Sequence, residues 1–321
     1  MRSKSDSMTL RISVILSLIL AVTWLISAQR DLLLRPLSHD LFGYSRKERP
    51  LILYTYSESK TARPNLEFFL SKGLHAEADF IFILNGRNSV RELIPDLENI
   101  KVIEKENKCF DLGSMGEVLR QDDLWKQYKR FITMNASIRG PFLPMYDSAC
   151  WTDIFLDRLN SNTKLVGTTI NCQPAPHVQS MLWAMDEVAM GILLDPDLAH
   201  TVGVEDHWGK AEDPVGLSFC HETMAEAVHT ELGSTRLITS QGYGVDVLMT
   251  AYSGASDLED YCNFGQFEDI LYPGKYYGSN IHPYETVFIK ANRDIDPVLL
   301  DKMTEWHLRR PLDSWTTCAP R

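Results

Sequence analysis

The stretch RFITMNASIRGPFLPMY, residues 130–146, decides the fold. Its residues 131–134 are mostly apolar and predict a short buried strand, which stops at the small residues Asn135, Ala136 and Ser137. A glycine and two prolines follow within seven residues and end the regular structure. In an open α/β sheet, ligands bind at the carboxyl ends of strands. The stretch therefore predicts a strand end that offers donors to a ligand.

The segments before this stretch alternate between strand and helix patterns. The expected strands are PLILYTYSES (50–59), ADFIFILNG (78–86), a short segment at 101–103 and FITMNAS (131–137), and the expected helices are TARPNLEFFLSKGL (61–74) and GSMGEVLRQDDLWKQYKR (113–130). This alternation is typical of a parallel sheet with helices on its faces. The predicted fold class is α/β, with a mostly parallel Rossmann-type sheet flanked by helices.

The second half of the chain is less regular. It predicts a helix at 150–162, a strand at 163–172, and a strand or helix pair at 177–195. The segment 218–243 predicts one long helix, or two that break at Gly233. A loop that leads into an apolar run is expected at 281–293.

The N-terminus predicts a membrane anchor. Residues 12–28, ISVILSLILAVTWLISA, carry no charge, and this length can span a bilayer. The flank before them is the more basic one, so we expect a cytosolic tail at 1–11, a signal-anchor at 12–28 and a stem at 29–49. A catalytic domain at 50–300 and a C-terminal tail at 301–321 would then lie in the lumen of the Golgi or endoplasmic reticulum. A cleaved signal peptide is the alternative, since LISAQ offers small residues.

Charge and cysteine content narrow the class further. The net charge of −11 argues against a nucleic-acid partner. The six cysteines are Cys109, Cys150, Cys172, Cys220, Cys262 and Cys318. In a luminal domain an even number permits up to three disulfides, whose pairing stays open, and free buried thiols are the alternative. No pair has the spacing of a zinc finger.

Three motif-like segments favour ordinary explanations. HETMAEAVH begins like a zinc-protease motif, but His221 and His229 are eight residues apart and cannot share a metal by that spacing. Asp195-Pro196-Asp197 is a possible metal-binding pair, although the proline favours a turn. Asn135 begins a glycosylation sequon, which we expect to stay unmodified if it lies in a cleft.

Polar groups elsewhere are less specific by themselves. Asp111 precedes a Leu-Gly pair where a helix is expected, and small residues at a helix start leave N–H groups free for an anion. Simple capping of that helix is the alternative role for Asp111. A polar loop at 177–180 and a polar group at 282–290 are each consistent with a solvated surface.

Taken in order, five segments between residues 51 and 293 resemble the rhamnan synthesis protein F type of glycosyltransferase, and more closely its relatives anchored in eukaryotic secretory membranes. The similar positions are Glu106, Asn107, Asp111 and Gly113 in the first; Asn135, Ser137, Gly140, Pro141 and Pro144 in the second; Val166, Gly167 and Thr168 with His177, Gln179 and Ser180 in the third; Glu231, Gly233, Ser234, Arg236, Gly242 and Tyr243 in the fourth; and, loosely, His282, Pro283, Phe288, Ile289 and Lys290 in the last.

The resemblance implies a GT-A fold and transfer of a hexosyl or deoxyhexosyl group from a nucleotide-sugar donor to a glycan, lipid or protein acceptor. It implies that Glu231 is the general base if the transfer inverts configuration. It implies donor contacts from Tyr54, Asn107, Asp111, Gly113, Asn135, Ser137, Arg139, His282 and Lys290, and acceptor or cleft contacts from His177, Gln179, Ser180 and Arg236.

One position departs from the family pattern. Ala136 stands where the bacterial relatives have Asp, and Asn135 and Ser137 offer only neutral oxygens. Mn²⁺ and Mg²⁺ prefer carboxylate oxygens, so metal dependence stays open and no metal ligand is assigned. Basic side chains and backbone N–H groups would then meet the diphosphate charge. The alternative function is a catalytically silent relative that binds glycans or partners through the same cleft.

Overall fold

The computed structural model describes residues 47–203, 206–263 and 268–318. The predicted signal-anchor, the cytosolic tail and most of the predicted stem lie outside these residues. Within the described ranges, no helix is both long and apolar enough to cross a membrane.

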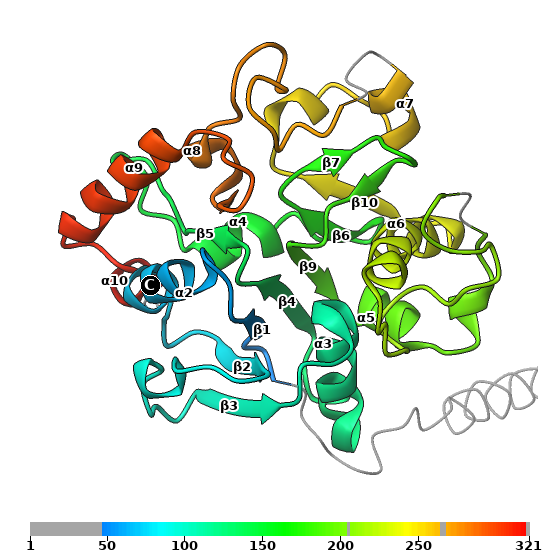
Figure 1. Ribbon diagram of the computed structural model, residues 1–321, viewed down its shortest axis with the longest axis horizontal. Helices are drawn as coiled ribbons and strands as arrows, with labels where there is room; N and C mark the ends of the chain where they lie inside the picture. Colours follow the sequence, from blue (N-terminus) through cyan, green and yellow to red (C-terminus); the bar gives the residue numbers. More distant parts are fainter. Residues whose placement is uncertain (1–46, 204–205, 264–267, 319–321) are drawn as a thin grey trace, which may run out of the picture. The chain divides into compact units, whose positions relative to one another are not determined.

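A seven-stranded sheet with the order β10-β6-β9-β4-β1-β2-β3 forms the centre of the domain (Figure 1). Its strands are β1 (Leu51–Ser57), β2 (Asp79–Asn85), β3 (Ile100–Lys105), β4 (Arg130–Asn135), β6 (Thr163–Gly167), β9 (Leu182–Asp186) and β10 (Gly244–Val247). β9 runs antiparallel to β4 and β6, and every other neighbouring pair of this sheet is parallel. The predicted mostly parallel sheet is confirmed. Two small antiparallel sheets pair β5 (Ile138–Arg139) with β11 (Ile289–Lys290) and β7 (Ile170–Asn171) with β8 (His177–Val178).

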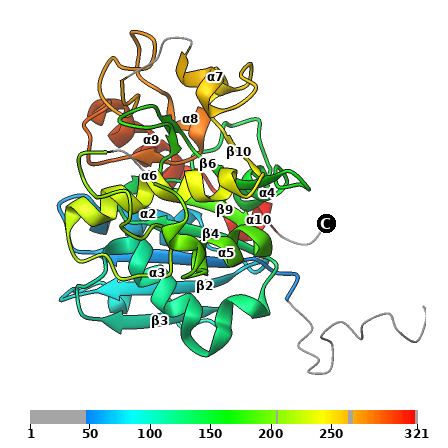
Figure 2. The same cartoon turned by 90° about the vertical axis from the view of Figure 1, so that its right-hand side faces the viewer.

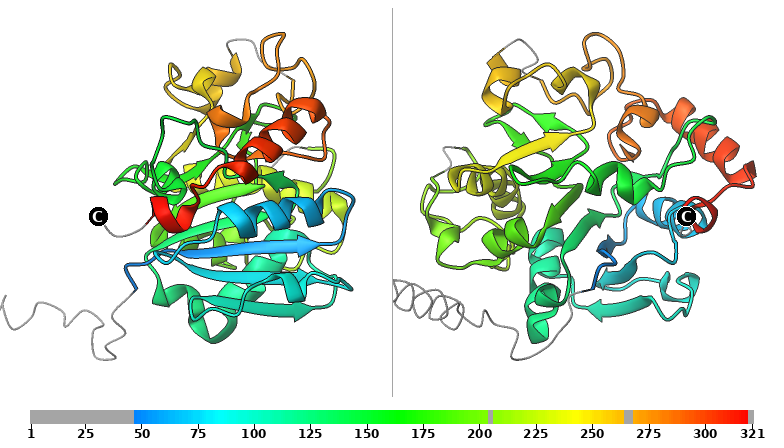
Figure 3. Two further views of the ribbon diagram at one scale, coloured as in Figure 1. Left: turned by 90° about the vertical axis from the view of Figure 1, so that its left-hand side faces the viewer. Right: turned by 180° about the vertical axis from the view of Figure 1, so that it is seen from behind.

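Helices cover both faces of the large sheet. α2, α9 and α10 lie on one side, and α3, α5 and α6 lie on the other (Figures 2 and 3). The α-helices are α2 (Ala62–Lys72), α3 (Phe110–Arg120), α4 (Trp151–Leu156), α5 (Glu187–Leu194), α6 (Met224–Ser240), α7 (Leu258–Asn263), α8 (Pro283–Thr286), α9 (Pro297–Arg309) and α10 (Ser314–Thr317). Short 3₁₀ helices span Arg91–Leu93, Gln121–Gln127, Leu198–His200 and Thr250–Tyr252. The arrangement is a layered α/β fold.

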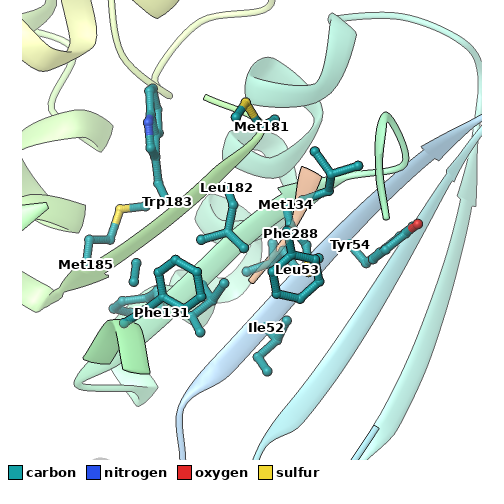
Figure 4. Close-up of a cluster of buried hydrophobic side chains, with 14 of the residues drawn as sticks. Ile52, Leu53, Tyr54, Phe131, Met134, Met181, Leu182, Trp183, Met185 and Phe288 are labelled. Atoms are coloured by element: carbon teal, nitrogen blue, oxygen red, sulfur yellow. The ribbon is translucent and has the colours of Figure 1, made fainter. Parts of the chain in front are cut away.

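Apolar side chains of β1, β4 and β9 form the centre of the core. Leu53, Phe131, Leu182 and Trp183 are fully buried, and Figure 4 shows their side chains in one cluster. A strand buried on both faces has a continuous apolar run rather than an alternating pattern. This is why these strands can be recognised in the sequence.

The order of strands reverses at the boundary between β1 and β4. β2 and β3 extend the sheet on one side of β1, and β4 lies on the other side. Thr55 of β1 is in register with Asn135 of β4, and the Ala136 N–H donates to the Thr55 carbonyl at 2.9 Å. In open α/β sheets, ligands bind outside the carboxyl ends of strands at such a reversal. The opening stretch of the sequence therefore ends where a ligand is expected.

Two helices differ from their predicted bounds. The helix expected at 113–130 ends at Arg120, because Asp122 and Asp123 have φ angles of 52° and 54° inside the following 3₁₀ segment. α6 is continuous through Gly233, so the predicted break is absent. Its start is fixed by a capping box, in which the Thr223 hydroxyl and the Glu226 carboxylate each accept a backbone N–H of the other's end of the turn.

Residues 301–318 form part of the packed domain instead of a tail. They include most of α9 and all of α10, and the Arg310 guanidinium donates to the carbonyls of Leu143 and Pro144 at 3.0 and 3.3 Å. Near the first described residues, Glu48 and Cys318 line one cavity of about 550 Å³. Both ends of the domain thus meet close to the amino ends of the strands.

Three disulfides join distant parts of the chain. They pair Cys109 with Cys220, Cys150 with Cys318, and Cys172 with Cys262, across sequence separations of 111, 168 and 90 residues. The predicted maximum of three disulfides is therefore reached, and none of the six cysteines is free.

Candidate functional site

Three polar side chains form a hydrogen-bonded chain at the carboxyl end of β4. Asp111, in the first turn of α3, accepts a hydrogen bond from Asn135 Nδ2. Asn135 Oδ1 accepts from the backbone N–H and the hydroxyl of Ser137, at 3.1 and 2.6 Å. The Leu112 N–H donates to Asp111 Oδ1 at 3.0 Å. The structure thus brings together three residues that the sequence places in two separate segments.

Glu231 supplies a second carboxylate from the middle of α6. Its Oε1 accepts the Ser180 N–H at 2.6 Å. Burial alone would raise the pKa of Glu231, but the charges of His177 and Lys290 and the hydrogen bonds from Ser180 outweigh burial and lower it below the ordinary value. Glu231 is therefore ionised at neutral pH.

Asp111 has the opposite electrostatic setting. Burial raises the pKa of Asp111, and the negative charge of Glu231 raises it further, while the hydrogen bonds from Asn135 and Leu112 oppose the rise only in part. Two carboxyl groups whose surroundings move their pKa values apart are typical of sites that carry out acid–base chemistry.

Two cations predicted for the site adjoin Glu231. The His177 ring is buried, and its Nδ1–H donates to the Ala175 carbonyl at 2.7 Å. Lys290 lies on β11, and the neighbouring Ala291 N–H donates to the Ser137 carbonyl at 2.8 Å. Within the described part of the chain, the Lys290 amine has no hydrogen-bond or ion-pair partner, so it is available to a ligand.

Four residues expected to contact the donor have structural roles. Tyr54 is fully buried with its ring stacked on a phenylalanine of α2, so it faces the core and not the cleft (Figure 4). A Cβ on Gly113 would lie 2.9 Å from Cys109 Cβ and 3.0 Å from the Phe219 carbonyl, so this glycine permits close packing of α3. His282 Nδ1 accepts the Tyr284 N–H and caps α8. Arg139 points toward α2 and α9, where its Nε and Nη1 donate to Asn65 and Thr304.

The remaining predicted residues lie around the rim. Asn107 Oδ1 accepts from the Ser57 hydroxyl at 3.5 Å, which brings the loop after β3 to the end of β1. Gln179 is buried and bonded to Thr169 and Asp269, so it holds its loop in place. Arg236 is exposed on α6.

Sequence reasoning missed His221 as a neighbour of Asp111. His221 is buried beside Cys220, its Nε2 has no partner among the described residues, and Asp111 acts on its charge. Burial lowers the pKa of His221, against smaller opposing effects. His229 is held separately by Asp206 at 2.8 Å, so the two rings have different partners. The disulfide from Cys220 to Cys109 links the two segments, and its pairing could not be known from the sequence.

Possible metal ligands gather elsewhere in the described ranges. The two groups of at least three such side chains are His75, Cys150 and Cys318, and Cys109, Glu117 and Cys220. Each group contains both sulfurs of a disulfide, which are not the thiolates that bind metals. Asp195 Oδ1 accepts the Asp197 N–H at 2.8 Å, as the turn interpretation of that pair predicts.

The sequence matches no known protein family and no curated protein. Its fold is partly similar to three solved structures. They are a mannosyltransferase of Pyrobaculum calidifontis in complex with GDP-Man and Mn²⁺ (10% identity, TM-score 0.32, 47% of this chain and 48% of that one), a putative nucleotide-diphospho-sugar transferase of Desulfovibrio desulfuricans (13%, 0.29, 52% and 72%) and the glycosyltransferase GlyE of Streptococcus pneumoniae (7%, 0.36, 65% and 47%). The chain spans about half the length of the first and third of these. With such low TM-scores, the function has to be argued from the chain's own residues.

Proposed function

We propose that the protein is a glycosyltransferase that moves a sugar from a nucleotide-sugar donor to a glycan, lipid or protein acceptor. The observation that carries this proposal is the chain of Asp111, Asn135 and Ser137 at the strand reversal, with the ionised carboxylate of Glu231 nearby. Nucleotide ligands bind at this point of open α/β sheets. A GT-A fold, kinship with the rhamnan synthesis protein F type and hexosyl or deoxyhexosyl specificity belong to the same proposal.

The two carboxyl groups suit different tasks. Asp111 is held by two hydrogen bonds, so it is positioned to bind a hydroxyl of the ribose or the sugar. If the transfer inverts configuration, a base must take the proton of the acceptor hydroxyl. Glu231 is ionised and can accept that proton, with Lys290 close enough to act on its charge.

A divalent metal fits these residues poorly. Asn135 Oδ1 already accepts two hydrogen bonds from Ser137, and the side chain of Ala136 has no oxygen. Asp111 is then the one carboxylate at the strand end, whereas Mn²⁺ and Mg²⁺ prefer several oxygen ligands with carboxylates among them. We infer that Lys290 and backbone N–H groups, and not a metal, meet the diphosphate charge.

The test is calorimetric titration of the purified protein with UDP-, GDP- and dTDP-sugars, with Mn²⁺ and with EDTA. We expect one donor class to bind, with similar affinity in both conditions. Binding that requires Mn²⁺ would contradict the metal-independent site, and failure of every nucleotide sugar to bind would contradict the proposed function.

We also propose a type II topology with the domain in the lumen of the Golgi or endoplasmic reticulum. Three disulfides support an oxidising compartment, because such bonds are rare in the cytosol. The basic flank before residue 12 supports a cytosolic N-terminus. Protease added to sealed microsomes should leave residues after 30 intact, and their digestion would rule out this orientation.

A catalytically silent binding protein is the second candidate, favoured by Ala136. This residue is 5% exposed and fills the place of an acidic side chain with a methyl group. Donor binding without release of nucleotide, in the presence of a broad mixture of glycan acceptors, would support the second candidate over the first.

A further inference from the structure

A second polar cavity adjoins the candidate site. It has a volume of about 490 Å³, within the range of small-molecule sites, and lies between the loop after β1, strand β11 and the start of α9. Two contacts connect it to the strand end that carries Asn135. Asn65 donates to the Ala136 carbonyl at 2.8 Å and accepts from Arg139 Nε, and Ala291, which lines the cavity, donates to the Ser137 carbonyl.

Lys290 belongs to both places. It lines the cavity, and its charge lowers the pKa of Glu231. A ligand in the cavity would therefore lie beside the carboxylate that we propose as the base. This is the position that an acceptor needs.

Arg139 gives the cavity a buried polar group with capacity to spare. Its side chain is only 9% exposed, and it lines the cavity. Nε and Nη1 donate to Asn65 and Thr304, and the Asp301 carboxylate is 3.8 Å from Nη1. Nη2 has no partner among the described residues. A buried donor without a partner is costly, so Nη2 favours a ligand that accepts a hydrogen bond.

The charges on the wall indicate a neutral ligand. Three cations, Lys60, Arg139 and Lys290, are matched by three carboxylates, Asp294, Asp296 and Asp301. A phosphate or a carboxylate on the ligand would be repelled by the three acidic residues. Sugar hydroxyls both donate and accept, so they can bond the two kinds of group at once. The apolar part of the lining, which includes Ile281, Ile289 and Leu299, can pack against the C–H face of a sugar ring.

We propose that this cavity is the acceptor subsite and that it takes a neutral saccharide. The inference rests on the proposed function, since an acceptor implies a donor. Asp294 and Asn292 are its test positions, because both are exposed and line the cavity, and substitution there leaves the core untouched.

The experiment measures binding of the labelled full-length protein to an array of neutral, sialylated and phosphorylated glycans. We expect neutral glycans to bind. Asn292→Trp, which fills the cavity, should abolish binding, and Asp294→Asn should weaken it about 10- to 150-fold, the loss of one charge-assisted hydrogen bond. Asp122→Asn is the matched control, because Asp122 is also an exposed aspartate with positive φ and lies outside the cavity.

Nucleotide-sugar titration of the same variants separates this inference from the proposed function. Donor affinity should be unchanged in both cavity variants. If the parent binds donor but no neutral glycan, or if both cavity variants bind glycans as the parent does, the acceptor subsite is wrong and the donor site stands. Binding of acidic glycans alone overturns the neutral assignment. If glycans bind in the cavity and no donor binds, the cavity is a saccharide site but not an acceptor subsite.

Discussion

At the scale of single residues, Asp111 and Glu231 set the properties of the site. Both are carboxyl groups in sheltered positions, yet the surroundings move their pKa values in opposite directions. Asp111 has neutral hydrogen-bond donors and a negative neighbour, whereas Glu231 has two cations nearby. Conservative substitution of each one should therefore give a different result.

Asp111→Asn should weaken donor binding and raise thermal stability. Loss of a charge-assisted hydrogen bond corresponds to roughly 1.5–3 kcal/mol, or about 10- to 150-fold in Kd. The pKa of Asp111 is raised in the folded state, so its ionised form opposes folding at neutral pH. The Tm of the variant should exceed that of the parent at pH 7, and the difference should shrink as the pH falls below about 4, where the parent carboxyl is protonated in both states. Calorimetry and thermal melts measure both effects, and an unchanged Kd would remove Asp111 from the donor site.

Glu231→Gln should keep donor affinity and lose turnover. Removal of a general base lowers rates by about 10²- to 10⁴-fold. Because the pKa of Glu231 is lowered, the parent should stay active down to pH values near the ordinary glutamate pKa of about 4.3, and lose activity below it. Rates of nucleotide release from pH 4 to 8 test this. Glu259→Gln, an exposed change on α7, is the control. Full turnover in Glu231→Gln would leave Glu231 with only its structural bond to Ser180.

At the scale of secondary structure, close packing of α3 fixes the position of Asp111. A Cβ on Gly116 would lie 1.8 Å from the Leu217 carbonyl, so α3 and the segment that leads to Cys220 are in direct backbone contact. The sequence pattern GSMG suggested free N–H groups for an anion. In the structure, its two glycines allow this contact.

Gly116→Ala should destabilise the protein and also weaken donor binding. Excess volume in a packed site costs about 1–3 kcal/mol, and relief of the clash would shift the helix that carries Asp111. Gly191→Ala is the matched control, since a Cβ there meets only Trp125, at 3.5 Å, and alanine improves helix propensity. Denaturant unfolding and donor titration measure both effects, and equal stability of the two variants would contradict the packing role.

The sequence predicts the elements of the sheet better than their arrangement. Continuous apolar runs mark β1, β2 and β4, because these parallel strands are buried on both faces. The same continuity hides which side chains face the ligand, and Tyr54 was assigned to the donor for this reason. The antiparallel direction of β9 and the partners of Arg139 depend on contacts across 50 or more residues, which no local pattern encodes. The grouping of Asp111 with Asn135 could be predicted, because strand ends of a parallel sheet share one edge.

At the scale of the whole molecule, the disulfides tie the second half of the chain and the C-terminus to the sheet. Cys150–Cys318 closes the longest loop, and Cys109–Cys220 fixes the segment beside Asp111. The chain from 301 onward is therefore part of the fold, although its mixed composition predicts a tail.

Cys150→Ser should destabilise the domain by roughly 2–5 kcal/mol, because the long closed loop restricts the unfolded chain. The loss should appear in denaturant unfolding without reductant. Donor affinity should be retained in the folded fraction, because this disulfide lies near the amino ends of the strands, opposite the candidate site. Mass analysis of the parent under non-reducing conditions should give the three pairs found here, and any other pairing would contradict the described fold.

The meeting of residues 48 and 318 at one cavity means that the order of the chain can be changed without a change in fold. A short linker from Cys318 to Lys47 would close the domain into a ring. The ring could be opened in the exposed turn at Asp122 and Asp123, which lies between α3 and β4. Such a circular permutant would detach the domain from its N-terminal segment while keeping every strand and disulfide, since domains with adjacent ends tolerate this rearrangement.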